Sequence, residues 1–235
     1  IIVYVADDVI APGGWLAAMV EPFVDPAVAI VGGKAVPRWE AEPPAWLAQF
    51  GDNGGTYLSM LDLGDNRLEL AWPQGVYGCN MAVRRTVLKE VGGFNPDGMG
   101  DRRQIWQRGD GETGLHRKVF TAGYKVIYEP LAWLFHRVPA TRLQSHYFYW
   151  RAFTQGISDS YSWMRSNRPG KQALLHAALR SLRSAARCSY HAWRSSEHGL
   201  ALHAQAWYWW GIGQHQLRLI FHPALRQHVL REVYL

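Results

Sequence analysis

The stretch Gly109-Asp110-Gly111-Glu112, followed by a helical run and then Ala122-Gly123-Tyr124, decides how we interpret this chain. It places two acidic side chains at the predicted start of a helix, directly after a loop rich in Gly and Arg. A carboxylate at a helix N-terminus is stabilised by free backbone N–H groups and by the helix dipole. Such a position suits a catalytic acid, although a simple N-cap role for Asp110 is the commoner case. The neighbouring segments help to distinguish a catalytic role from an N-cap role.

Upstream of it, strands and helices are predicted to alternate. Residues 1–5 predict a strand buried on both faces, as in a parallel sheet, and it runs into Asp7 and Asp8. Residues 12–16 predict the start of a helix, and residues 28–31 a second strand closed by two glycines. Acids at the carboxyl end of a parallel strand lie where open α/β sheets bind ligands. The alternation predicts an α/β fold built from βαβ units.

Later segments continue this pattern. Residues 52–65 predict a loop, and residues 75–83 a strand whose glycines permit close backbone approach. A helix is predicted over residues 86–91. Two further short strands, 125–128 and 133–136, are predicted on either side of Glu129-Pro130, and the pattern is helical from residue 140 onwards.

Charge divides the chain into two parts. Residues 1–136 carry a net charge of −4 and residues 137–235 a net charge of +10. Segment 173–194 is amphipathic: Leu175, Ala178, Leu182 and Ala186 mark one face, and arginines the opposite one, namely Arg180, Arg183, Arg187 and Arg194. We therefore expect an anionic partner for the tail, with a solvated face on an ordinary packed helix as the open alternative.

Segment 198–217 has no Lys, Arg, Asp or Glu but contains three tryptophans, Trp207, Trp209 and Trp210. Its His and Gln residues make it too polar for a membrane span, so we expect it to lie in a membrane interface. Cys79 and Cys188 lack the spacing of a disulfide framework or zinc site, and no signal peptide is visible. We expect a cytoplasmic protein that is peripheral at the inner face of the plasma membrane.

With these segments placed, the chain resembles the catalytic domain of inverting family 2 glycosyltransferases, which have the GT-A fold. The resemblance covers about residues 1–165 and rests on the order of four motifs. They are residues 5–9 with 12–16, residues 78–85 with 91–94, residues 109–112 with 122–124, and residues 128–132 with His136.

The resemblance implies a partial GT-A domain over residues 1–165 that lacks its N-terminal βαβ half, and a helical tail over residues 166–235. The chain opens on a strand and without Met, so we expect a fragment that is inactive alone. The implied activity moves a sugar from a nucleotide-sugar donor to a glycan or lipid-linked acceptor with inversion. The Gln-X-X-Arg-Trp motif of processive members is absent, which favours transfer of a single sugar.

The resemblance also implies a metal site. In the family's Asp-X-Asp motif the last Asp binds the metal, which corresponds to Asp8, whereas the first position is Ala6 and leaves Asp7 for the nucleotide. His136 is a second candidate ligand, and a satisfied core or surface histidine is the alternative. A diphosphate leaving group needs its charge neutralised, and these ligands suit Mn²⁺ or Mg²⁺.

Inversion needs a base that takes the proton of the acceptor hydroxyl. The resemblance gives this role to Glu112, with Asp110 second, and a helix N-terminus should keep the carboxylate ionised. Asn80, Arg84 and Arg85 are candidates for substrate binding, while surface charge at a helix start is the alternative for at least one of the arginines.

Two other classes of function stay open. Because Ala6 replaces the first Asp of the motif, the chain could be a non-catalytic fragment or a partner-binding module. A membrane-surface binder led by the basic tail is the other class. Nucleic acid is not expected as a partner, because the aromatic residues of the tail do not form a stacking series on a basic sheet.

Overall fold

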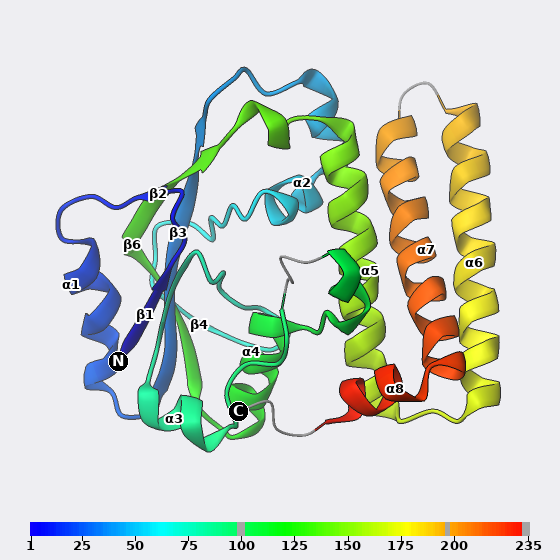
Figure 1. Cartoon of the computed structure of the whole chain (residues 1–235). Coiled ribbons are helices and arrows are strands. Elements are labelled where there is room, and N and C mark those ends of the chain that lie inside the picture. The colour runs from blue at the N-terminus through cyan, green and yellow to red at the C-terminus, as the bar shows by residue number, and fades with distance from the viewer. Residues whose placement is uncertain (98–101, 196–197, 232–235) are drawn as a thin grey trace.

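The computed structural model describes residues 1–97, 102–195 and 198–231. A strand-rich part with helices on both faces of an open sheet is followed by long helices that stand side by side (Figure 1). The predicted α/β class and the helical C-terminal part are therefore confirmed.

The sheet has the strand order β1-β5-β3-β6-β2, and β4 pairs with β6 outside this path. Only β3 and β6 pair in parallel; the other named strand pairs are antiparallel. The strands are β1 Ile2–Val5, β2 Val9–Ile10, β3 Val28–Trp39, β4 Leu68–Leu70, β5 Asn80–Val83 and β6 Lys125–Val138.

The prediction of β1 as a strand of a parallel sheet, buried on both faces, is wrong. β1 pairs antiparallel with β5, and Val5 is 51% exposed. Because β5 is inserted between β1 and β3 and runs against both, β1 and β3 have the same direction without being neighbours. The βαβ order in the sequence is thus real, but its strands are separated by a strand that comes later in the chain.

Strand lengths also differ from the sequence-based predictions. Gly32-Gly33 does not close β3, which continues to Trp39; a Cβ at Gly33 would collide with the Ala132 carbonyl, so this glycine permits close approach instead of a turn. The two predicted strands around Glu129-Pro130 are one continuous strand, β6. The predicted strand over residues 75–83 is confined to β5, and the predicted loop over residues 52–65 contains helix α2, Asp52–Tyr57.

Both faces of the sheet are covered by apolar packing. On one face, α1 (Trp15–Val20) and the 3-10 turn η1 (Glu21–Val24) bury Met19 and Phe23 against β3. On the other face, α3 (Arg85–Glu90) and α4 (Gly111–Thr121) bury Val87, Leu115 and Val119. The first turn of α4 is thereby fixed against the sheet.

The helical part consists of α5 (Ser145–Asn167), α6 (Lys171–Arg194), α7 (Gly199–Phe221) and α8 (Pro223–Leu230). α5 and α7 approach closely, since a Cβ at Gly156 would collide with the Tyr208 carbonyl and one at Gly211 with the Phe153 carbonyl. Short 3-10 segments complete the fold: η2 Ala45–Phe50, η3 Arg102–Gln107 and η4 Ala140–Arg142.

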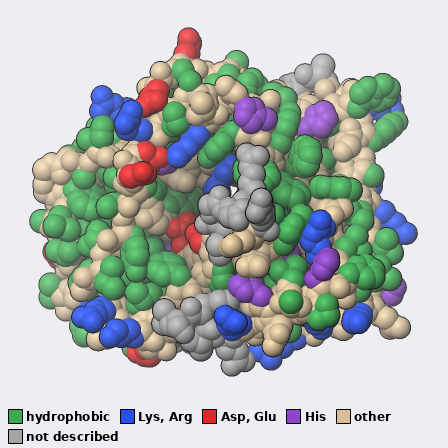
Figure 2. Space-filling model, in the orientation of Figure 1, with side chains coloured by type: hydrophobic (Ala, Val, Ile, Leu, Met, Phe, Trp, Pro, Cys, Tyr) green, Lys and Arg blue, Asp and Glu red, His purple; other side chains and the backbone are tan. Residues whose placement is uncertain are grey.

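On α6 the four arginines are exposed, as predicted, but the buried stripe differs. Leu174 is buried whereas Leu175 is 42% exposed. Figure 2 shows Lys, Arg and His side chains spread over the helical part, while acidic side chains gather over the strand-rich part. Among the described residues, no helix combines the length and apolar character that crossing a membrane requires.

Candidate active site

Segments from four parts of the chain meet at one edge of the sheet. The pairing of Val5 with Asn80 brings the turn after β1 next to the loop before β5. The pairing of Val9 with His136 brings the same turn next to β6. The first turn of α4 approaches from the helical side, where the Gly78 backbone N–H donates a hydrogen bond to Glu112 Oε2. This edge therefore gathers the predicted metal and base residues.

Asp8, His136 and Arg142 form one cluster. Asp8 Oδ1 lies 3.2 Å from His136 Nε2, and Arg142 Nη2 donates to Asp8 Oδ2 at 2.8 Å. Arg142 Nη1 is 3.4 Å from His136 Nε2. The histidine side chain is 3% exposed and the carboxylate 25%. The two predicted ligands are thus brought together, with a guanidinium beside them that the sequence did not point to.

The cluster offers two candidate ligands for a small divalent cation, and the Arg142 guanidinium lies beside both of them. Asp8 Oδ1 is buried and, among the described residues, has no hydrogen-bond partner. Adjacent ligands of an octahedral ion at about 2.1 Å lie about 3.0 Å apart, close to the observed separation of Oδ1 and Nε2. Within the described residues, no group of three or more His, Cys, Asp or Glu side chains could hold an ion. The remaining ligands would have to be water or phosphate oxygens, which is usual for Mg²⁺.

Glu112 occupies the first turn of α4 and is partly buried. Burial raises the pKa of Glu112 to about 7, against which the Gly78 N–H, Arg151 and Arg108 act more weakly. The expectation that the helix N-terminus keeps this carboxylate fully ionised is therefore too simple, because desolvation outweighs the hydrogen bond. A group with a pKa near 7 can both accept and release a proton at neutral pH.

Glu112 opens into a polar cavity of about 480 Å³. The same cavity is lined by Tyr77 of the loop before β5 and by Arg151 of α5. Burial, together with the charges of Glu112 and Asp8, raises the pKa of the Cys79 thiol to about 12. The thiol therefore stays neutral at neutral pH.

Asp110 is the N-cap residue of α4 by position, but its side chain makes no cap hydrogen bond. The carboxylate is instead buried and accepts hydrogen bonds from three side chains. Asn95 Nδ2 donates to Oδ1 at 2.6 Å, and Arg117 Nη2 and Ser162 Oγ donate to Oδ2 at 3.0 and 2.6 Å. Asp110 therefore joins the loop before α4 to α4 and α5, and this geometry favours Glu112 as the base.

Asn80 is 1% exposed and its amide is committed to the protein. Its Nδ2 donates to the carbonyls of Lys34 and Ala132 at 3.1 and 2.8 Å, and its Oδ1 accepts from Trp15 Nε1 at 2.9 Å. Both N–H groups of the amide are used. These contacts indicate a structural role in place of the expected contact with a substrate.

Arg84 and Arg85 lie at the other end of β5, about 13 Å along the strand from Asn80. Arg84 donates to the carbonyls of Val28, Phe23 and Asp25 at 2.8–2.9 Å, so it ties β5 to the end of η1. Arg85 is exposed at the start of α3. The register places both arginines away from the cavity of Glu112, and their assignment to substrate binding stays a prediction. Asp7 is exposed in the turn before β2.

The sequence analysis missed the cavity-facing side of α5. Its polar side chains follow helical spacing and line the cavity of Glu112: Arg151, Gln155, Ser158, Asp159 and Ser162. This polar stripe along an otherwise buried helix was the available signal. Arg151 Nε is buried and has no hydrogen-bond partner among the described residues.

Comparison with known proteins agrees with this geometry. No protein-family model matches the chain. It is 26% identical over 172 residues to a glucosyl-dolichyl phosphate glucuronosyltransferase of Haloferax volcanii. The match covers 67% of this chain and 49% of that protein, so the chain spans about half the length of this curated relative. The similarity supports a glycosyltransferase.

Proposed function

We propose that this protein is an inverting, family 2 glycosyltransferase that moves a single sugar from a nucleotide-sugar donor to a glycan or lipid-linked acceptor. The proposal keeps the partial GT-A domain expected from the sequence. The observation that carries it is the convergence of Glu112 with the Asp8–His136 pair at one edge of the sheet. The name of the relative, which includes a sugar-bearing lipid phosphate, supports a lipid-linked acceptor.

In this mechanism Glu112 takes the proton of an acceptor hydroxyl. The acceptor oxygen forms a bond to the anomeric carbon as the bond from that carbon to the phosphate oxygen breaks, and attack from the opposite face inverts the configuration. The Gly78 N–H holds Glu112 Oε2, which leaves Oε1 for the proton. The pKa of about 7 lets Glu112 return the proton to water after transfer.

Asp8 and His136 would hold Mn²⁺ or Mg²⁺. When bound, the ion neutralises the charge that develops on the diphosphate leaving group. Arg142, which already binds Asp8 Oδ2, adds a second positive charge at the same place. We assign the nucleotide contact to Asp7, which is exposed in the turn next to Asp8.

Metal binding can be measured apart from catalysis. Electron paramagnetic resonance of Mn²⁺ with the protein, with UDP or GDP added, should show binding that Asp8→Asn and His136→Ala abolish. Asp7→Asn is the matched control: it should keep metal binding and weaken only the nucleotide. Transfer that is insensitive to EDTA and to Asp8→Asn would contradict the metal-dependent mechanism.

Contact with an anionic membrane surface is a separate part of the proposal. It is supported by the exposed side chains of Arg180, Arg183, Arg187 and Arg194 on α6, next to an exposed Trp193. The chain should sediment with anionic but not with neutral liposomes, and changing the four arginines to Gln should remove this binding. Equal sedimentation of the variant would contradict a membrane role for α6 and the peripheral cytoplasmic location.

A further inference from the structure

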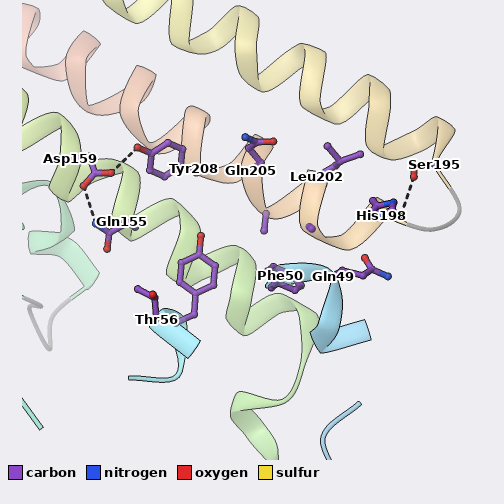
Figure 3. Close-up of a pocket in the computed structure, with 13 residues that line it drawn as sticks. Gln49, Phe50, Thr56, Gln155, Asp159, Ser195, His198, Leu202, Gln205 and Tyr208 are labelled. Atoms are coloured by element: carbon purple, nitrogen blue, oxygen red, sulfur yellow. Dashed lines mark hydrogen bonds between the residues drawn. The ribbon is translucent and has the colours of Figure 1, made fainter. Parts of the chain in front are cut away.

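A second and larger hollow lies beyond the cavity of Glu112. It has a volume of about 800 Å³ and lies between the η2–α2 segment and α7, with α5 along its floor. Figure 3 shows its labelled residues on these elements, with Leu202, Gln205 and Tyr208 on α7 and Gln49, Phe50 and Thr56 on the η2–α2 segment. We call it the α7 cleft. The helical tail thus supplies one complete wall of it.

The α7 cleft adjoins the cavity of Glu112. Thr56, Gln155 and Asp159 line both spaces. A molecule bound in the α7 cleft would therefore lie next to the cavity that contains the proposed base.

A preorganised polar group stands at the junction of the two spaces. Asp159 Oδ1 accepts a hydrogen bond from Gln155 Nε2 at 2.9 Å, and its Oδ2 accepts one from the Tyr208 hydroxyl at 2.7 Å (Figure 3). A carboxylate oxygen has two acceptor positions, so each oxygen keeps one for a ligand. The proposed reaction gives Asp159 no role, although burial raises its pKa.

The position of Tyr208 is fixed by backbone packing. Because a Cβ at Gly156 would collide with the Tyr208 carbonyl, α7 is seated directly on the α5 backbone at this level. Tyr208 extends its hydroxyl to Asp159 from this closely packed level. The tail is therefore packed tightly on α5 where the cleft meets the cavity.

The lining combines aromatic rings with amides and a carboxylate. Phe50, Tyr57 and Tyr208 supply rings, Gln49, Gln155 and Gln205 supply amides, and Asp159 is the acid. This set suits a ligand with C–H-rich faces and many hydroxyl groups, because rings pack against the faces and polar groups bind the hydroxyls. A wholly apolar ligand would leave these groups unpaired.

We propose that the α7 cleft is the acceptor subsite, that it binds a saccharide, and that Asp159, Gln155 and Tyr208 recognise the hydroxyl groups of the sugar nearest to Glu112. The acceptor role of the cleft rests on the proposed function, whereas saccharide binding is inferred from the lining of the cleft alone. It assigns the helical tail a direct part in substrate recognition.

The binding test needs no donor and no transfer. Methyl glycosides of glucose, galactose, mannose and N-acetylglucosamine are the probes, and saturation-transfer-difference NMR on the 235-residue chain is the measurement. Leu202→Trp fills the cleft and should abolish the signal of every probe that binds. His203→Trp, at the next position on α7 but outside the cleft lining, is the matched control and should leave it unchanged.

Two conservative changes test the polar group without altering its shape. Asp159→Asn and Tyr208→Phe should each weaken the best probe by about tenfold, the effect of one hydrogen bond to a charged group. Circular dichroism and thermal melting show whether the variants fold. If no probe binds the parent chain, or if Leu202→Trp binds as well as His203→Trp, the inference is wrong.

The outcome also separates this inference from the proposed function. If the probes bind in the cleft but Glu112→Gln leaves transfer intact, the saccharide site stands and the proposed mechanism fails. If transfer depends on Glu112 while Leu202→Trp leaves the acceptor KM unchanged, the mechanism stands and the cleft is not the acceptor subsite.

Discussion

The two ends of β5 carry polar residues that look equally suited to a ligand site, but only one end lies at the candidate active site. At the Asn80 end, the preceding Gly78 and Cys79 lie against Glu112 and the Asp8 cluster. At the other end, the guanidinium of Arg84 donates hydrogen bonds to three backbone carbonyls, and Arg85 is exposed. A strand of four residues thus separates a site of candidate chemistry from a structural anchor.

This difference shows why residues of one sequence motif need not belong to one site. Residues adjacent in sequence were assigned to one site, but a strand has direction, and its ends lie at opposite edges of the sheet. The two ends differ in what their charged side chains border. Glu112 lines a polar cavity, whereas the guanidinium of Arg84 is bound to carbonyl groups of the protein.

The largest expected effect is at the Asn80 end. In a form of the protein that is active in sugar transfer, Glu112→Gln removes the proposed base while keeping the shape of the side chain, and it should lower kcat by about 10²–10⁴. Donor binding, measured by calorimetry, should stay within about twofold. A variant with normal kcat would remove the carboxylate-base mechanism from Glu112.

Asp110→Asn is the matched control two residues earlier. Because Asp110 binds Arg117, Ser162 and Asn95, its change should cost stability, on the order of 1–3 kcal/mol, and leave most transfer per folded molecule. Should Asp110→Asn be inactive while folded and Glu112→Gln active, the base role passes to Asp110.

The next effect is at the opposite end of β5. Arg84→Ala should lower the free energy of unfolding by about 2–3 kcal/mol, since it leaves three carbonyls without their charged donor. Arg85→Ala should change it by less than about 0.5 kcal/mol. Urea denaturation measures both. A loss of donor binding in either variant at full stability would restore the arginines to the site.

The sequence was informative where chemistry and local structure coincide. Asp8 and His136 each follow an apolar run, and Glu112 stands at a predicted helix start, so all three were candidate site residues from the sequence. The 3.2 Å distance between Asp8 Oδ1 and His136 Nε2 depends on the pairing of β2 with β6. This is a tertiary contact, which the resemblance could only suggest.

Other features could not be predicted from local patterns. Gly32-Gly33 has the composition of a turn but serves close packing: Gly32 lies against Val76, and Gly33 lies against Ala132, about a hundred residues later in the chain. The insertion of β5 between β1 and β3 is likewise a choice of topology that hydrophobic periodicity does not encode. The raised pKa of Glu112 follows from burial, which no cap motif reveals.

A smaller effect is expected from Gly78→Ala. A Cβ at this position would lie 2.6 Å from Glu112 Oε2, so the carboxylate must move by a few tenths of an ångström or more. We expect kcat to fall by about tenfold, because a displaced catalytic group loses alignment with the reacting atoms. Melting temperature is the control, because a fall in kcat supports misalignment of Glu112 only in a variant that stays folded. An unchanged kcat in a stable variant would contradict the role of the Gly78–Glu112 contact in catalysis.

The last effect is the dependence on pH, and the pKa of Glu112 fixes its sign. The ionised base is the active form, so kcat/KM should rise with pH and level off above about 7, falling about tenfold for each unit below. The unfolded-state pKa of Glu112 is near 4.5, so the folded state binds more protons than the unfolded state between about pH 4.5 and 7. The contribution of Glu112 to stability is therefore present at low pH and lost as the pH rises through 7.

Activity and stability should change in opposite directions between pH 4.5 and 7. Glu112→Gln should remove both dependences, so the variant should be more stable than the parent at pH 8. Denaturation of the two proteins from pH 4.5 to 8 tests this, and a parent that gains stability relative to Glu112→Gln as the pH rises would show that the carboxylate is not desolvated in the folded protein.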